Sequence, residues 1–278
     1  LQRSSHEGAE DCQDDSRNLW TDLSGTGNIG KVLMKKEYSV IVEKTAYPVL
    51  FSDEKEALLA AKAAGRAVLG LWDAEYPENI PAEIPYLVED EAQLTEEFLE
   101  RLVRRFLNLP WIIAKTRRLR IREFIPGDWE RISAFFGNYP RRALGQIFID
   151  GECPAAFVDE WAFLSYIRVQ YPFYEYGIWA VEETENHELI GGCGFWDGEM
   201  GETEIGYWIF PAFQRRGYAK EAVQAVLAYA RYLGKIPIYA QIREENLPSR
   251  KLAEKVQFIL LPEQSQSRKL RYRYVPYY

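Results

Sequence analysis

One stretch of the sequence joins an apolar strand, a short loop with two arginines and a glycine, and the start of a long helix. It runs from Glu204 to Ala219, and its loop reads QRRGY over residues 214–218. Such a loop aims backbone N–H groups and the positive end of a helix dipole at one point, and a glycine lets a ligand approach the main chain. Arginine side chains add charge-assisted hydrogen bonds. These residues therefore predict a binding site for a pyrophosphate.

The same stretch resembles the GNAT acetyltransferases. Residues 214–219 match the Gln/Arg-x-x-Gly-x-Gly/Ala motif of that superfamily, and the run EIGYWIFPAFQRRGYAKEAVQAVLAYA is similar to its RimJ/RimL branch, which acetylates ribosomal proteins. Further along, residues 246–249 and 252–258 resemble the N-x-x-S-x-x-L-x-E-K-x-G-F signature of that branch. The resemblance covers about residues 117–278. Two motifs in the right order are more specific than either one alone.

The resemblance implies that acetyl coenzyme A is the cosubstrate. The main chain at Ile209 and Phe210 is expected to pair with its pantetheine arm, and Asn246 to bond the same arm. Asn246 also precedes Pro248 as a helix-capping residue would, and the two roles are compatible. The loop is expected to hold the pyrophosphate through Gln214, Arg215, Arg216, Gly217, Tyr218 and Ala219.

Acyl transfer to an amine needs a base for the ammonium proton and an acid for the departing thiolate. Glu204 stands where the RimJ/RimL pattern also has Glu, so it is the candidate base, directly or through water; a solvated strand-edge Glu is the alternative. Many GNAT enzymes have a Tyr where this chain has Ala253, which removes the usual acid. Ser249 matches the Ser of the branch and is the candidate acid, although it also suits the first turn of a helix. Tyr218 is another possible donor, and Gln257 replaces the Gly of the second motif.

The substrate side is less specific. Acids crowd the hairpins that lead to Glu204, and aromatic residues lie near them in the sequence, which suits a cationic amine. Solvated turns and core rings are the alternative interpretation. The acids are Glu182, Glu183, Glu185, Glu188, Asp197, Glu199, Glu202 and Glu204, and the aromatic residues are Trp161, Tyr174, Tyr176, Trp179 and Trp196.

Composition excludes several classes of protein. The chain has 278 residues, 47% hydrophobic and 27% charged, which is the balance of a globular protein. Its net charge is −8, and the first 116 residues hold 13 basic and 21 acidic side chains, whereas the rest hold 21 of each. This balance counts against nucleic-acid binding, and no apolar run is long enough to span a membrane. Two histidines and three dispersed cysteines predict no metal site and favour reduced thiols in a cytoplasmic protein.

The elements that must position the site follow from hydrophobic periodicity. Residues 1–37 contain a polar leader that is expected to be poorly ordered; its run Ser24–Gly30 resembles a phosphate loop only superficially because no apolar strand precedes it. Residues 38–116 predict an open α/β domain with right-handed crossovers. Its expected strands are 40–42, 49–51, 67–72, 86–88 and 111–114, and its expected helices are 53–64 and 91–107.

Residues 117–278 predict a mixed α/β acetyltransferase domain. A half-buried strand over 117–122 and a turn at 126–128 lead into a helix with Trp129, Ile132 and Phe135-Phe136, and residues 137–158 are expected to be irregular. A helix over 159–170 should place Trp161, Leu164 and Ile167 in the core. The remaining expected strands are 176–182, 188–196, 203–210 and 236–242, and the remaining expected helices are 218–233 and 248–256.

Part of the first domain, from Ala57 to Glu89, resembles the tail of a haloacid-dehalogenase-type domain. That family needs an Asp-x-Asp motif after its first strand, and none occurs. Asp53 is a single acid that also suits a helix N-cap. We therefore expect a noncatalytic domain, with an active hydrolase as the alternative.

The sequence thus predicts transfer of acetyl from acetyl coenzyme A to a primary amine, either a protein N-terminus or a small molecule, by direct attack. A noncatalytic sensor of acyl coenzyme A is the alternative, supported by the missing Tyr and the appended domain. The oligomeric state stays open.

Overall fold

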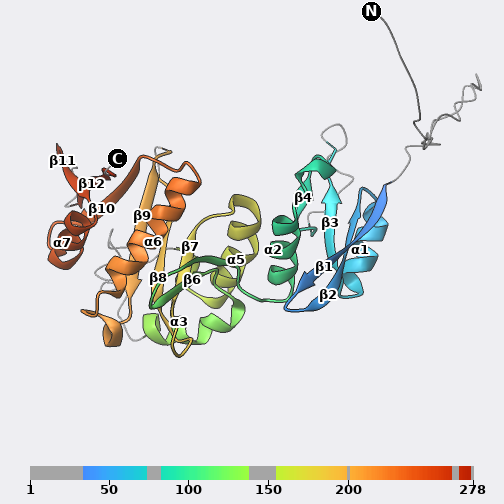
Figure 1. The fold of residues 1–278 in the computed structure, drawn as a ribbon, viewed down its shortest axis with the longest axis horizontal. Helices are drawn as coiled ribbons and strands as arrows, with labels where there is room; N and C mark the ends of the chain where they lie inside the picture. The colour runs from blue at the N-terminus through green and yellow to red at the C-terminus, as the bar shows by residue number, and fades with distance from the viewer. Residues whose placement is uncertain (1–33, 74–82, 138–154, 199–200, 265–268, 277–278) are drawn as a thin grey trace, which may run out of the picture. The chain divides into compact units, whose positions relative to one another are not determined.

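The computed structural model describes residues 34–73, 83–137, 155–198, 201–264 and 269–276, which build two β-sheets with helices packed on them (Figure 1). Most of the predicted leader lies outside the described residues, with the run Ser24–Gly30, His6 and Cys12. So do Cys153, Glu199 and most of the segment expected to be irregular. The first strand starts at Lys35, three residues before the domain was expected to begin.

The first sheet has four strands in the order β1-β2-β3-β4. β1 and β2 form an antiparallel hairpin, and β3 and β4 add to it in parallel, so the predicted α/β layer is confirmed with an antiparallel first strand. The hairpin turn uses Glu43 and Lys44, both with positive φ. The elements are β1 (Lys35–Val42), β2 (Thr45–Ser52), α1 (Lys55–Ala63), β3 (Ala67–Leu71), β4 (Leu87–Val88) and α2 (Glu96–Phe106).

Two helix starts in this region differ from expectation. The helix predicted over 91–107 is split, because the Thr95 hydroxyl accepts a hydrogen bond from the Phe98 N–H and so caps α2 at Thr95. A short 3-10 helix, Glu91–Gln93, precedes it. Asp53 does not cap α1; its carboxylate accepts from the Met34 N–H at 2.7 Å and holds the start of β1 beside the end of β2.

The second sheet has eight strands in the order β11-β12-β10-β9-β8-β7-β6-β5. Every neighbouring pair is antiparallel except β9 and β10, which run parallel. The strand predicted at 111–114 as the last of the first domain is β5, which pairs with β6 in this sheet. The strands are β5 (Ile112–Lys115), β6 (Leu119–Arg122), β7 (Ile178–Glu183), β8 (Leu189–Asp197), β9 (Thr203–Ile209), β10 (Ile238–Arg243), β11 (Phe258–Gln264) and β12 (Lys269–Tyr274).

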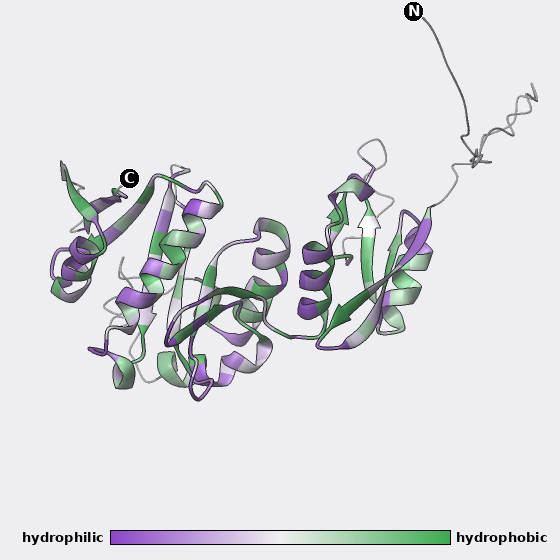
Figure 2. Ribbon diagram, in the orientation of Figure 1, coloured by the Kyte–Doolittle hydropathy of each residue, from purple (hydrophilic) through white to green (hydrophobic). Residues whose placement is uncertain are grey.

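Among the residues that the structure describes, four helices accompany this sheet: α3 (Trp129–Gly137), α5 (Glu160–Tyr174), α6 (Tyr218–Tyr232) and α7 (Leu247–Lys255). Hydrophilic and apolar residues alternate along α2 and α6 in Figure 2, as expected of helices with one buried face. The predicted core face of α5 is partly wrong. Ile167 is buried, but Trp161 is 79% exposed, and Phe163 and Tyr171 take the core positions instead.

The two faces of the second sheet carry different side chains, because neighbouring residues of a strand point in opposite directions. On one face, the Trp208 ring contacts Phe124 and Phe157. On the other, the Trp179 ring contacts Tyr229 of α6, so this is the face that α6 covers. Within the part of the chain that the structure describes, no helix is long and apolar enough to cross a bilayer.

Candidate functional site

The predicted pyrophosphate loop forms a sharp turn directly before α6. Gly217 is the N-cap residue of α6, with φ +84°, and Arg215 also has a positive φ of 63°. Gly217 has no side chain to cap the first-turn N–H groups of the helix, and in the described part of the chain the N-cap position makes no side-chain cap hydrogen bond. The positive end of a 15-residue helix is therefore left with uncapped donors, which is the arrangement that binds an anion.

The other loop residues divide into those that shape the turn and those that extend from it. The Gln214 side-chain amide donates to the Ile209 carbonyl at 2.8 Å and closes the loop against the end of β9. The Arg216 guanidinium lies over the Phe213 ring, 5.5 Å from its centroid. Tyr218 is buried and its hydroxyl donates to Glu183, so this hydroxyl is already engaged away from the acyl end and is a poor candidate acid.

β9 and β10 separate beyond their first contacts and leave a fork in the sheet. Within the described parts of both strands, the register covers only Ile238 with Thr203 and Tyr239 with Glu204. Beyond Glu204 the edge of β9 that faces β10 has no strand partner in that register. A sheet edge without a partner offers N–H and C=O groups to an extended ligand.

The register of β8 and β9 decides which backbone groups lie at this edge. The Phe210 N–H donates to the Ile190 carbonyl of β8 at 2.8 Å, so this predicted pantetheine contact is engaged on the other side of the strand. Because hydrogen-bonding direction alternates along an antiparallel strand, Tyr207 and Ile209 face the fork. Ile209, a predicted pantetheine contact, therefore lies at this edge, with its carbonyl held by Gln214.

Glu204 lies at the apex of the fork. It is 7% exposed, and one carboxylate oxygen accepts a hydrogen bond from the Gln241 side-chain amide, so the two strands contact each other through these side chains. Trp196 is the direct cross-strand partner of Glu204, and its ring covers Gly206, where an added Cβ would come within 2.5 Å of it. A buried carboxylate thus lies beside a half-buried aromatic ring.

Ser249 lies in the first turn of α7, on the far side of the fork. The Asn246 side-chain oxygen accepts from the Ser249 N–H at 3.2 Å, which confirms the capping role of Asn246. The buried Tyr207 hydroxyl lies near the Ser249 side chain without a well-aligned hydrogen bond between them. Burial raises the pKa of Tyr207, and its interaction with Ser249 opposes that shift, so the phenol keeps its proton at neutral pH.

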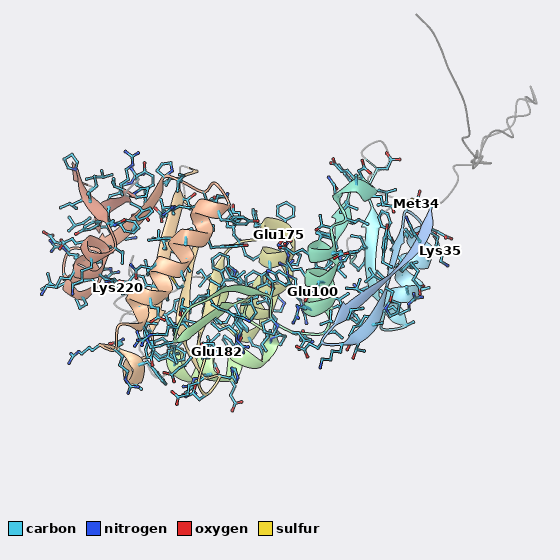
Figure 3. All side chains as sticks on the ribbon, in the orientation of Figure 1. Met34, Lys35, Glu100, Glu175, Glu182 and Lys220 are labelled. Atoms are coloured by element: carbon cyan, nitrogen blue, oxygen red, sulfur yellow. The ribbon has the colours of Figure 1, made fainter. Side chains whose placement is uncertain are left out.

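Apart from Glu202, whose carboxylate lies near that of Glu204, the acids near Glu204 in the sequence do not gather around it. Most of them pair with a partner of their own, so solvated turns and local ion pairs describe them better than one acidic surface. Buried Glu182, which is labelled in Figure 3, pairs with Arg122 and Arg120 on β6. The other pairs are Glu188 with Arg131, Asp197 with Lys235 and Glu202 with Arg271, and Glu183 accepts from Tyr218.

The aromatic residues that were predicted to lie near these acids are dispersed in the same way. Trp179 is fully buried, and Tyr176 stacks on Phe195 in the core. Trp161 and Tyr174 are exposed on α5. Trp196 is therefore the member of the set that the strand register places directly beside Glu204.

Several residues of the site were missed by the sequence argument. Tyr207 and Gln241 belong to short strands whose alternation shows a buried face but not what it meets. Arg118 and Glu221 contact the loop and its helix, although 103 positions separate them. The alternating run 117–122 predicted a strand correctly, yet nothing in it distinguishes Arg118 from its basic neighbours. Among the described residues, no group of His, Cys, Asp and Glu could hold a metal ion.

Comparison with known proteins bears on the second sheet. A family model described as an acetyltransferase (GNAT) domain matches residues 118–259, just over half of the chain. The uncharacterized N-acetyltransferase YjdG of Bacillus subtilis is 35% identical over 85 residues, which are 30% of this chain and 51% of YjdG. The chain spans about half the length of the curated relatives it matches.

Solved structures with a similar fold cover the same region. The acetyltransferase from Agrobacterium tumefaciens is 25% identical, with a TM-score of 0.48, and the match covers 59% of this chain and 94% of the other. A putative ribosomal-protein-serine acetyltransferase from Vibrio cholerae is 20% identical, with a TM-score of 0.46, and the match covers 60% and 98%.

Proposed function

Because the chain belongs to the GNAT acetyltransferase family, we propose that it transfers the acetyl group of acetyl coenzyme A to a primary amine by direct attack, without an acetylated enzyme. One observation carries this proposal. The fork between β9 and β10 joins a sheet edge without a strand partner, a buried carboxylate at its apex and an uncapped helix N-terminus beyond its open end.

The fit of acetyl coenzyme A rests on two features of this chain. The positive φ of Gly217 and the uncapped first turn of α6 suit the pyrophosphate. The backbone of Tyr207 and Ile209 suits an extended pantetheine arm, and Asn246, which caps α7 after β10, is proposed to bond the same arm. Arg215 and Arg216 add positive charge at the phosphate end. The cosubstrate supplies an acetyl group activated as a thioester.

Glu204 is the proposed base. The attacking amine must lose a proton as its nitrogen bonds to the acetyl carbon, and a carboxylate at the apex of the fork can accept it, directly or through a water. Gln241 donates to one oxygen of Glu204 and so fixes the plane of the carboxylate. Trp196 beside it provides a ring face for a cationic amine before the proton leaves.

Ser249 is the proposed donor to the sulfur when the carbon–sulfur bond breaks. A serine hydroxyl is weakly acidic, so a donor behind it assists. Tyr207 lies near Ser249 on the β9 side and keeps its proton, so its phenol can stabilise the Ser249 oxygen as that proton moves. The Ser249 hydroxyl would then lie between the sulfur and the Tyr207 hydroxyl across the fork.

The acceptor class follows from the pair of Glu204 and Trp196, which suits a primary ammonium in a small molecule or at a protein N-terminus. An N-terminus is the preferred candidate because it is the acceptor of the RimJ/RimL branch that residues 204–230 and 246–258 resemble.

The test is release of thiol from acetyl coenzyme A over a panel of amines and peptides with free or blocked N-termini. Acceptor-dependent release with free N-termini, and none with blocked ones, supports the proposal. Tight binding of the cosubstrate without turnover on any acceptor would favour a noncatalytic sensor. Absence of binding would refute the site itself.

A further inference from the structure

Arg118, which precedes β6, contacts the residues on both sides of Gly217 at the start of α6. Its guanidinium donates to the Arg216 carbonyl at 2.9 Å and lies 4.5 Å from the centre of the Tyr218 ring. At Gly217, an added Cβ would meet the same guanidinium at 3.4 Å. A side chain that is about 100 positions away in the sequence therefore contacts the turn on both sides of Gly217.

Arg118 is itself fixed by Glu221, in the first turn of α6. One Glu221 oxygen accepts from the Arg118 side chain at 2.8 Å, and the other accepts from the Thr116 hydroxyl at 2.6 Å and the Arg118 N–H at 3.0 Å. Although burial opposes ionisation, hydrogen bonds from Thr116 and Arg118 lower the pKa of Glu221, so it is charged at neutral pH. Both partners of the ion pair are thus locked in one geometry, at 33% and 20% exposure.

The hydrogen bond from Arg118 to the Arg216 carbonyl also fixes the direction of the Gly217 N–H. In a trans peptide the C=O and the following N–H point in opposite directions. Because the Arg216 carbonyl points to Arg118, the Gly217 N–H points away from Arg118. Gly217 is the N-cap of α6, so this N–H directly precedes the first-turn N–H groups of the helix in the chain. The positive φ of Gly217 then continues the turn into the helix.

We propose that Arg118 is a positioning residue for the pyrophosphate of acetyl coenzyme A, acting through the Arg216–Gly217 peptide, with Glu221 and Thr116 holding it in place. This inference rests on the acetyl coenzyme A site proposed above. Arg118 holds the peptide so that the Gly217 N–H is already directed at the anion before binding. Its charge is neutralised by Glu221, so its contribution is geometric rather than a general attraction of phosphate.

The experiment measures the affinity of the full chain for coenzyme A by calorimetry, with Arg118→Met, Arg118→Lys and the control Arg117→Met. Arg117 is the exposed neighbouring residue, and its substitution removes the same charge. We expect Arg118→Met to weaken binding about tenfold or more, since it removes a charge-assisted bond that fixes the loop. Arg118→Lys should lose most of the same affinity because a lysine cannot make the forked contacts, and Arg117→Met should bind as the wild type does.

A second substrate distinguishes a loss of phosphate positioning in Arg118→Met from a general loss of structure. Turnover with S-acetylpantetheine, which lacks the pyrophosphate, should have the same KM in Arg118→Met as in the wild type. An equal loss with both ligands, or an equal loss in Arg117→Met, would overturn the inference. If Arg118→Met does not unfold cooperatively, and so is not properly folded, the affinity for coenzyme A and the KM for S-acetylpantetheine are compared in Arg118→Lys and Thr116→Val instead. If the wild type does not bind coenzyme A, the site proposed above fails instead.

Discussion

The phosphate end and the acyl end of the proposed site are built in different ways. The phosphate end is one continuous segment in which Gly217 and the start of α6 set the backbone directions. The acyl end is assembled from β9, β10 and α7, which supply Glu204, Gln241 and Ser249, and Glu204 accepts from Gln241 beside the last paired residues of the two strands. Binding of the cosubstrate should therefore depend on backbone conformation at the first end, and the rate of transfer on side-chain chemistry at the second.

The largest expected effect tests the phosphate end. Gly217→Val should abolish binding of coenzyme A, because a β-branched residue is strained at a φ of +84° and relief of that strain would change the turn that directs the N–H groups at the start of α6. Gly234→Val is the matched control, since Gly234 follows the other end of the same helix with φ +71° and open space around it. Calorimetry with coenzyme A measures both. Retained affinity in Gly217→Val would place the pyrophosphate elsewhere.

The next effect tests the acyl end. Glu204→Gln should lower kcat about 100-fold or more, in the range that general-base catalysis contributes, while the affinity for coenzyme A stays at the wild-type value. Glu188→Gln, in an exposed ion pair with Arg131, serves as the control. A loss of coenzyme A affinity equal to the loss of rate would show that Glu204 supports structure instead.

A smaller effect is expected for the thiolate donor. Ser249→Ala and Tyr207→Phe should each lower kcat about tenfold, and the double variant should be no slower than the slower single variant, since both act on one proton transfer. Steady-state kinetics with a fixed acceptor measures all three. Multiplicative effects would mean that the two hydroxyl groups act independently, and water would then be the better candidate for the acid.

The smallest effect concerns stability. The pKa of Glu221 is lower in the folded chain than its ordinary value of 4.5, so its contribution is present above that value and is lost as the pH falls through the folded pKa. Glu221→Gln should therefore lower the Tm by about 2–4 °C at neutral pH, for a loss of about 1 kcal/mol. The difference from the wild type should shrink below pH 4.5. Thermal unfolding at several pH values checks it, and a constant difference would exclude Glu221 as the group responsible.

The sequence by itself determined most of the elements around the site, because hydrophobic periodicity and turn residues act over a few positions. It placed the strand at β9, the loop at Gly217 and α6 almost to the residue. The prediction that Trp161 lies in the core was wrong. Helical spacing showed which residues share a face of the helix, but not which face the sheet covers. The sequence also assigned β5 to the first domain, because the residues of a strand do not show which other strand it pairs with.

Only the tertiary structure decided which side chains meet. It gave most of the acids near Glu204 partners of their own, turned the Phe210 amide toward β8, and brought Arg118 to a loop far along the chain. The physical reason is that register and sheet order are set by the packing of the whole core, whereas the conformation of a glycine turn is set by its own backbone.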